Sequence, residues 1–457
     1  MAPNWLLKVR AVAAQFSSGG EAINNIRIVT LFDSPEAHIF TLIPQTAKHY
    51  PAAYETLLQL EGRALKCAST GTEFPAVPAP AAVFLDVRSI DATLLSQSPR
   101  SWRPPQLPPS GYLAQRRARI DAEVARTGRP EEEVGSRIFR QTDGRVIEIP
   151  GLPPMDDYES FPQIPLDAPV VPLIRGGREL FMQADGVFLA RHEKPIYAVG
   201  PLLPPGYGLG QTQVSLTDPR DMEIASFLEK MRAKYGDKSV LFISFGTIFW
   251  PKLYEQVEDL IEVLVEEKCP FVSFRHIRSD RQMVTYIAAD FMSASPLASV
   301  PEGLAEKIKD SVLGLATPWA PQQFVLSHPA TGWFMTHCGH GGIIESLCSG
   351  VPMICWPFEA DQPFAAAQLT QNLDVAFQLL EVRTGAPAEQ RIRRTHARPC
   401  ARRAEIRRVP TECRGAVGVA KRENVQKIQG GLAQAWEEGG TARAALQAFF
   451  VKFLEAA

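Results

Sequence analysis

The sequence predicts an α/β protein made of two doubly wound domains that face a cleft. In the C-terminal half, short apolar runs alternate with amphipathic helical segments, which is typical of parallel sheets with right-handed crossovers. The N-terminal half repeats this pattern less regularly. Between the two halves, residues 201–218 are rich in Pro and Gly and have no periodicity, as expected of a linker.

The C-terminal half begins with a predicted helix at 217–236, which Thr217 or Asp218 caps and Gly236 ends. A helix at 251–269 carries its apolar residues on one face. Buried strands are expected at 239–247, 271–275, 312–317, 332–336, 352–356 and 375–382. Ligands of such sheets bind beyond the carboxyl ends of the strands.

The N-terminal half predicts strands at 26–32 and 81–87 and a helix at 52–65. The chain opens with an amphipathic helical pattern rather than a strand, so the first strand of this domain is expected to be missing. The predicted division gives residues 1–200 to an incomplete first domain and 219–440 to a second domain. Residues 441–457 are predicted to form a C-terminal helix, for which packing back on the first domain is one option.

Composition narrows the class of protein. Apolar residues make up 45% of the 457 residues and the net charge is −2, which gives no reason to expect nucleic acid as a partner. Seven scattered cysteines without a C-x-x-C pair favour a reducing compartment, and we expect a cytoplasmic protein. No apolar run is long enough to span a bilayer. No D-x-D sequence occurs, so a metal that bridges phosphates is not implied. We expect no cofactor.

The stretch FMTHCGHGG followed by IIESLCSG reads as a strand, a glycine-rich turn and a helix. The amino end of such a helix presents unpaired N–H groups and the positive end of its dipole, which suits a phosphate. Gly339, Gly341 and Gly342 let the backbone approach an anion closely. His337, at the end of the strand, can add a donor or a positive charge.

Other polar residues nearby complete a candidate nucleotide-sugar site. The indole of Trp319 can stack on a flat heterocycle, and the carboxylate of Glu345 can accept two ribose hydroxyls. Asp361 and Gln362 follow a predicted strand and suit sugar hydroxyls. Each residue alone has an ordinary structural explanation. Their order on this topology favours the functional interpretation.

The motifs WAPQ, VL-x-H, G-x-F-x-THCG, E-x-x-x-x-GVP, WP and DQ resemble the signature of the family 1 UDP-glycosyltransferases, and the chain looks most similar to fungal members. The resemblance implies a GT-B fold, with two Rossmann-like domains and a UDP-sugar bound mainly by the second. It implies these contacts: Trp319 with uracil, Gln322 with uridine, Glu345 with ribose, His337 and Gly339 with the diphosphate, Gly246 and Thr247 on the phosphate side, and Asp361 and Gln362 with the sugar.

The chain departs from the family inside this motif. Where many members have Trp-Asn-Ser, it has His340, Gly341 and Gly342. The backbone donors are kept while an amide and a hydroxyl are lost, and His340 can supply a new donor. We expect altered rather than abolished donor affinity.

The resemblance also implies a single displacement with inversion, in which a His after the first strand acts as base and an Asp orients it. Asp86 matches the Asp. No His matches the base; the candidates in this half are His38, His49 and His192, and His38 lies nearest a predicted strand end.

A basic stretch at 391–414 holds nine Arg. It has three interpretations: a solvated loop, a patch for an anionic membrane or nucleic acid, or an error in the conceptual translation. The abrupt change in composition favours the third. The stretch at 87–112 fits the family equally poorly.

The function expected is transfer of a hexose, glucose by default, from a UDP-sugar to a hydroxyl of a small lipophilic acceptor. A UDP-sugar-binding protein without transfer activity is the alternative, and epimerisation of a nucleotide sugar is a third. Peripheral contact with a membrane stays open. The residues do not indicate the acceptor.

Overall fold

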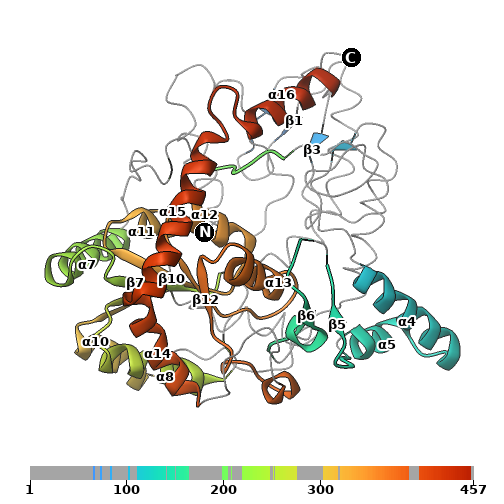
Figure 1. Cartoon of the computed structure of the whole chain (residues 1–457), viewed down its shortest axis with the longest axis horizontal. Coiled ribbons are helices and arrows are strands. Elements are labelled where there is room, and N and C mark those ends of the chain that lie inside the picture. Colours follow the sequence, from blue (N-terminus) through green and yellow to red (C-terminus); the bar gives the residue numbers. More distant parts are fainter. Residues whose placement is uncertain are drawn as a thin grey trace. The chain divides into compact units, whose positions relative to one another are not determined.

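The computed structural model describes residues 65–66, 71, 73–74, 83–84, 101–102, 111–139, 141–149, 151–163, 198–203, 207, 219–246, 251, 253–274, 302–317, 320–390 and 401–453 (Figure 1). The chain divides into two compact units. Unit 1 comprises 1–136, 170–205 and 435–457, and unit 2 comprises 137–169 and 206–434. This division assigns 137–169 to the second unit, unlike the predicted boundary at 200, which stays a prediction.

In unit 1, the described elements are two pairs of short strands and the helices. Strands β1 and β2 are antiparallel, with Leu65 opposite Phe74, and β3 and β4 are parallel. The bounds are β1 Leu65–Lys66, β2 Glu73–Phe74, β3 Val83–Phe84, β4 Ser101–Trp102, α4 Gly111–Thr127, α5 Glu131–Phe139, which crosses the boundary, and α16 Thr441–Phe453. The predicted strand at 26–32 and the expected loss of a first strand lie outside the described residues.

Unit 2 is built on a six-stranded parallel sheet with the strand order β12-β11-β10-β7-β8-β9. The bounds are β7 Val240–Ser244, β8 Phe271–Phe274, β9 Gly314–Thr317, β10 Thr331–Thr336, β11 Met353–Cys355 and β12 Ala376–Gln378. Strands β8 and β9 follow outward on one side of β7, and β10, β11 and β12 follow outward on the other side. The strand order therefore reverses between β7 and β10, and this switch point is where doubly wound sheets bind their ligands.

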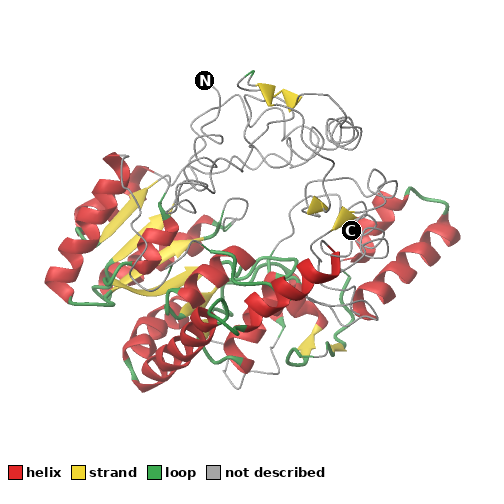
Figure 2. Cartoon of the chain, turned by 90° about the horizontal axis from the view of Figure 1, so that it is seen from above, coloured by secondary structure: helices red, strands yellow, loops and turns green. Residues whose placement is uncertain are grey.

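Helices cover both faces of this sheet (Figure 2). The bounds are α7 Pro219–Tyr235, α8 Tyr254–Glu266, α10 Glu302–Ser311, α11 Gln322–Ser327, α12 His340–Cys348, α13 Gln362–Ala367, η3 Gln368–Asn372, η4 Ala386–Glu389, α14 Arg402–Arg414 and α15 Ala416–Gln434. Every strand predicted in this half is present, and the doubly wound fold is confirmed for unit 2.

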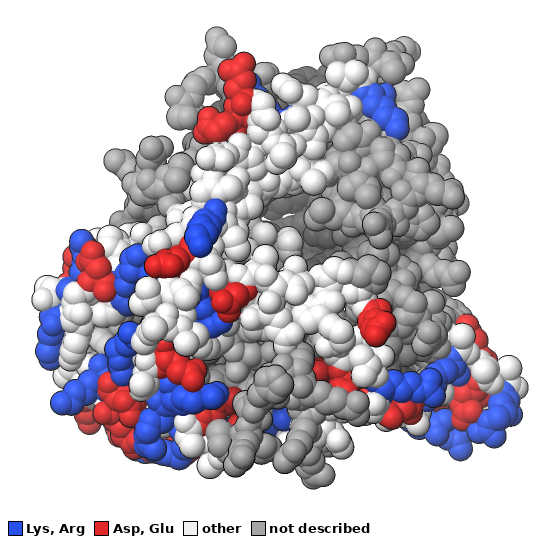
Figure 3. Space-filling model, viewed as in Figure 1, with Lys and Arg blue, Asp and Glu red and all other residues white. Residues whose placement is uncertain are grey.

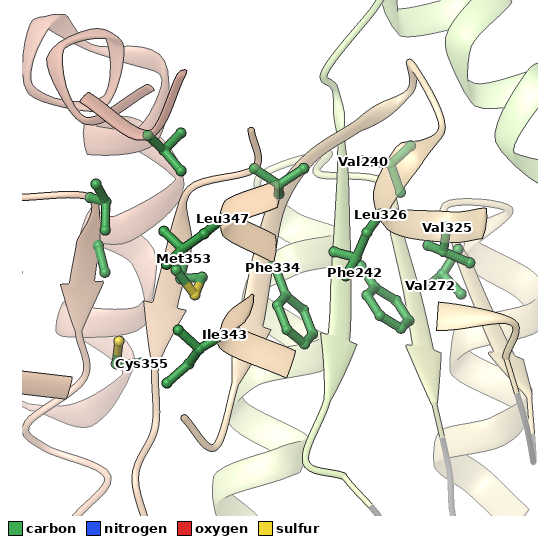
Figure 4. Close-up of a cluster of buried hydrophobic side chains, with 14 of the residues drawn as sticks. Val240, Phe242, Val272, Val325, Leu326, Phe334, Ile343, Leu347, Met353 and Cys355 are labelled. Atoms are coloured by element: carbon green, nitrogen blue, oxygen red, sulfur yellow. The ribbon is translucent and has the colours of Figure 1, made fainter. Parts of the chain in front are cut away.

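The period of two along each strand divides the core into two layers. Phe242 and Phe334 stack with ring centroids 5.2 Å apart, on the face covered by α7, α11, α12 and α15 (Figure 4). Their neighbours Ile243 and Trp333 point to the other face, where α8, α10 and α14 pack. Because both faces are buried, the strands read as continuous apolar runs, which is the pattern visible in the sequence.

The segment 137–169 packs within unit 2 through the antiparallel pair β5 Val146–Ile147 and β6 Met155–Asp156, followed by η2 Asp157–Ser160. The buried carboxylate of Asp157 accepts hydrogen bonds from the backbone N–H groups of Asp143 and Gly144, at 2.7 and 3.1 Å. The Gln163 amide donates to the carbonyl of Val382 at 3.0 Å, which ties the segment to the chain after β12.

The basic stretch forms a docked helix over 402–414, so its interpretation as a solvated loop is wrong for these residues. Ile406 and Val409 enter the core, and the buried Glu405 accepts hydrogen bonds from the backbone N–H groups that follow β12.

The arginines of α14 pair with acids of α8. The distances are 2.7 Å for Arg402 with Asp259, 2.7 Å for Arg403 with Glu262, 2.9 Å for Arg403 with Glu266, and 2.5 Å for Arg407 with Glu266. Charges of both signs accordingly intermix on this part of the surface (Figure 3). Such complementarity argues against an anion-binding patch and against a translation error at 402–414.

Candidate functional site

The site lies at the carboxyl ends of β7 and β10, where the strand order reverses. Ser244, at the end of β7, stands opposite Thr336, at the end of β10. Gly246 follows the first strand with φ of 73°, a conformation that glycine adopts without strain. His337 and Gly339 follow the second. The two loops therefore meet although they are far apart in the chain.

The imidazole of His337 occupies a slot between two glycines. A Cβ placed on Gly246 would stand 2.7 Å from its Cε1 atom, and one on Gly339 would stand 2.4 Å from its Nε2 atom. Burial lowers the pKa of His337 to about 4, and a hydrogen bond with the Ser244 backbone opposes this shift only in part. The ring is therefore neutral near pH 7. Of the two roles predicted for His337, the positive charge does not fit near neutral pH, and the role of donor to a phosphate stays a prediction.

Helix α12 begins directly after this slot. Gly339 is its N-cap, and its carbonyl accepts the first helical hydrogen bond, from Ile343 at 3.1 Å. The first amides of an α-helix point out of its end, so His340 and the glycines after it open α12 as an anion-binding terminus. His340 and Gly341 are exposed.

Packing does not require the two glycines that distinguish this turn. A Cβ on Gly341 would have no heavy atom within 4 Å, and one on Gly342 would make ordinary contacts with Phe334 at 3.4 Å and Gln322 at 3.7 Å. A Cβ atom fits at both positions. The departure from the family pattern therefore leaves open space at position 341, in the first turn of α12.

Glu345 lies one turn into α12, and its carboxylate accepts hydrogen bonds from two side-chain amides at the start of α11. The Gln322 Nε2 atom donates to one carboxylate oxygen at 2.6 Å, and the Gln323 Nε2 atom donates to the other at 3.0 Å. The backbone carbonyl of Glu345 accepts a hydrogen bond from the Tyr207 hydroxyl at 3.3 Å. Side chain and backbone of this glutamate are thus both restrained.

Further contacts hold the carboxyl end of α12. The Ser349 hydroxyl donates to the Tyr207 hydroxyl at 3.0 Å, and the Gln429 amide of α15 donates to the Cys348 carbonyl at 2.9 Å. Tyr207 is buried, which raises its pKa. Sequence analysis placed this tyrosine in a featureless linker and missed its role, because a single aromatic residue among Pro and Gly carries no pattern.

Asp361 and Gln362 stand at the start of α13, after β11. Asp361 is half-buried at the N-cap position, and no hydrogen bond from its side chain caps the helix. Gln362 is buried, and its Oε1 atom accepts hydrogen bonds from the backbone N–H groups of Phe358 and Glu359 at 3.0 and 3.3 Å. The oxygen is therefore engaged in the loop, which fixes the direction of the amide nitrogen.

Six residues singled out from the sequence lie outside the described residues: Thr247 and Trp319 on the donor side, and Asp86, His38, His49 and His192 on the acceptor side. Gln323 was not predicted, although the Gln-Gln pair after Pro321 was a visible signal. Among the residues described, no group of three His, Cys, Asp or Glu side chains is arranged to hold a metal ion. No helix in the described part of the chain is both long and apolar enough to cross a membrane.

Comparison with known proteins shows which family this sequence is similar to. A family model described as UDP-glucoronosyl and UDP-glucosyl transferase matches residues 182–384. The UDP-glycosyltransferase eriJ of Hericium erinaceus is 33% identical over 366 residues, which cover 74% of this chain and 67% of that protein. The chain belongs to the family 1 UDP-glycosyltransferases. UDP-glycosyltransferase 75B1 of Arabidopsis thaliana is 31% identical over 252 residues, and the match covers 55% of this chain and 48% of that protein.

Solved structures show the same fold for this UDP-glycosyltransferase. A UGT of Siraitia grosvenorii in complex with UDP aligns with a TM-score of 0.61 at 19% identity, covering 94% of this chain and 87% of that one. Phytolacca americana UGT2, complexed with UDP-2fluoro-glucose and pterostilbene, aligns with a TM-score of 0.57 at 21% identity, covering 92% and 82%. The GT-B fold predicted from the motifs is confirmed.

Proposed function

We propose that this UDP-glycosyltransferase transfers a hexose, glucose by default, from UDP to a hydroxyl of a small lipophilic acceptor, with inversion. The observation that carries the proposal is the site at the switch point of unit 2. It combines a helix terminus suited to a diphosphate, a neutral imidazole beside it and a preset carboxylate at Glu345. A nucleoside diphosphate presents phosphates and ribose hydroxyls to this set of groups.

In this proposal the diphosphate is the leaving group. Negative charge grows on it as the bond to the sugar breaks, and the first amides of α12 stabilise that charge without reorganising. The imidazole of His337 stays neutral at pH 7 because its pKa is about 4, so it lines the diphosphate site without adding a positive charge. Asp361 and Gln362 would bind sugar hydroxyls. The family resemblance assigns the base pair to Asp86 with a histidine, for which His38 is the candidate.

The names of relatives support the choice of donor and acceptor. The relatives include a hydroquinone glucosyltransferase of Rauvolfia serpentina, which is 34% identical over 182 residues covering 40% of this chain and 36% of that protein. Hydroquinone is a phenol and therefore a small lipophilic acceptor, and the word glucosyltransferase names glucose as the sugar.

A specific sequence feature favours a second function, UDP-sugar binding without transfer. No histidine matches the base of the family, whereas the donor side is built in detail. The two functions differ in turnover but not in nucleotide binding.

Isothermal titration calorimetry with UDP, together with turnover of UDP-glucose on a panel of phenols and sterols, tests both functions. We expect the parent protein to bind UDP. In the turnover assay we expect it to release UDP from UDP-glucose only when an acceptor is present, and NMR should show a product of inverted anomeric configuration. Trp319→Ala and Glu345→Ala should each weaken UDP binding about tenfold or more.

The matched control is Glu306→Ala, which removes an exposed glutamate of α10 in the same unit. It should bind UDP like the parent. UDP binding without turnover would replace the transferase by the second function, and equal UDP affinity in parent, Trp319→Ala and Glu345→Ala would refute the nucleotide site itself.

A further inference from the structure

Two consecutive glutamines at the start of α11 converge on one carboxylate of α12. Side chains of neighbouring helical residues diverge by about 100°, so both reach Glu345 only because its carboxylate lies between them, beside the first turn of α11. Both amide nitrogens must face the carboxylate, since amide oxygens would repel it. The distances of 2.6 and 3.0 Å are those of normal hydrogen bonds.

The two glutamines differ in what else they lie against. The Gln322 amide nitrogen is 3.7 Å from the position of a Cβ on Gly342, so it borders the first turn of α12. A nucleotide bound at that turn competes for this amide. Gln323 is not among the atoms nearest to a Cβ on Gly342, and it binds the other oxygen of Glu345. Gln323 can therefore keep the carboxylate in place while Gln322 turns to the ligand.

We propose that Gln323 is a positioning residue that orients Glu345 for the two ribose hydroxyls of the donor. The inference rests on the proposed function, because it assumes that the ligand is a ribonucleotide. A carboxylate has about four lone-pair directions, and the two amides use at most two of them, which leaves at least two for the 2′ and 3′ hydroxyls. A carboxylate held in one orientation loses less conformational freedom when the ligand binds.

The test compares UDP with 2′-deoxy-UDP by calorimetry in the parent, Gln323→Leu and Gln323→Lys. Leu keeps the size and removes the donor, whereas Lys restores a donor. We expect the parent to prefer UDP. Gln323→Leu should weaken UDP binding roughly three- to tenfold while changing 2′-deoxy-UDP binding much less, so that the preference shrinks. Gln323→Lys should keep the preference.

Gln429→Leu is the matched control, because Gln429 also donates an amide hydrogen bond to α12 but contacts the Cys348 carbonyl instead of Glu345. It should leave the ratio of the two affinities unchanged. If Gln323→Leu weakens both nucleotides equally, or neither, in a parent that prefers UDP, the inference alone is overturned. A parent that binds neither nucleotide overturns the proposed function and the inference with it.

Discussion

The imidazole of His337 fits in its slot because the two residues that flank it, Gly246 and Gly339, lack a Cβ atom. Gly246 also needs its positive φ, whereas Gly339 has φ of −69°, which any residue adopts. The requirement for glycine at 339 is therefore steric alone. This separates it from Gly341, where an added Cβ meets nothing.

Alanine substitution at Gly339 and at Gly341 should change stability in opposite directions. Gly339→Ala forces a Cβ to 2.4 Å from His337 and should destabilise the protein by about 1–3 kcal/mol. Gly341→Ala adds only helix propensity in the first turn of α12 and should stabilise by about 0.5 kcal/mol. Denaturant unfolding of the two variants measures both effects. Equal destabilisation would contradict the slot.

Stability should also depend on pH through His337. Its pKa is about 4 in the folded protein and 6.5 in the reference state, so the unfolded chain takes up the proton first as pH falls. Stability is therefore lost between about pH 6.5 and pH 4. His337→Asn removes this titration, so its unfolding free energy should fall less steeply over that window than that of the parent. Parallel curves in urea titrations at several pH values would show that burial does not shift this pKa.

At the residue scale, the sequence predicted individual site residues where fixed spacing carried the information. His337, Gly339 and Glu345 lie where strand–turn–helix reasoning puts them. Gln323 and Tyr207 were missed because their partners are set by tertiary packing: 22 residues separate Gln323 from Glu345, and 138 separate Tyr207 from it. The charge state of His337 was also beyond prediction, since it follows from burial.

Among the elements, α14 and α8 show how charge composition misleads when each segment is considered alone. The acids of α8 occupy the polar side of a helix that was predicted only from its apolar side. The arginines of α14 then seemed unmatched and indicated a loop or an error. Predicting the docked helix would have required knowing that the two segments become neighbours.

The α14–α8 contact should weaken at high salt. The parent should lose stability between low and 1 M NaCl, because screening acts on partly exposed ion pairs. The double variant Arg402→Gln, Arg403→Gln should lose less over the same range. Arg408→Gln is the control, since Arg408 pairs within its own helix, with Glu412 at 3.6 Å. Identical salt slopes for parent and double variant would assign the docking to apolar contacts of Ile406 and Val409.

For the molecule as a whole, the strand order of unit 2 decides where a ligand acts. The switch between β7 and β10 gathers the site on one end of the sheet, and α12 covers one face while α14 covers the other. The alternation of strands and helices predicted this topology well. For unit 1 the predicted topology cannot be compared with the structure in the same way, because few of its residues are among those described.

UDP should therefore protect one face of the sheet more than the other. Hydrogen exchange should slow in peptides from 320–348, which contain α11 and α12, and should change little in α14. At about 100 times its Kd, UDP should also stabilise the folded state by about 2.7 kcal/mol in thermal unfolding. Equal protection of α12 and α14 would contradict a site confined to the switch point.

The pairing of β7 with β10 joins segments about ninety residues apart in the chain. Because closing so long a loop is slow, we expect the two halves of the nucleotide site to come together late in folding. Gain of UDP affinity during refolding then marks completion of the central sheet. Any fragment that ends before α12 should fold, if at all, without acquiring the ability to hold the nucleotide.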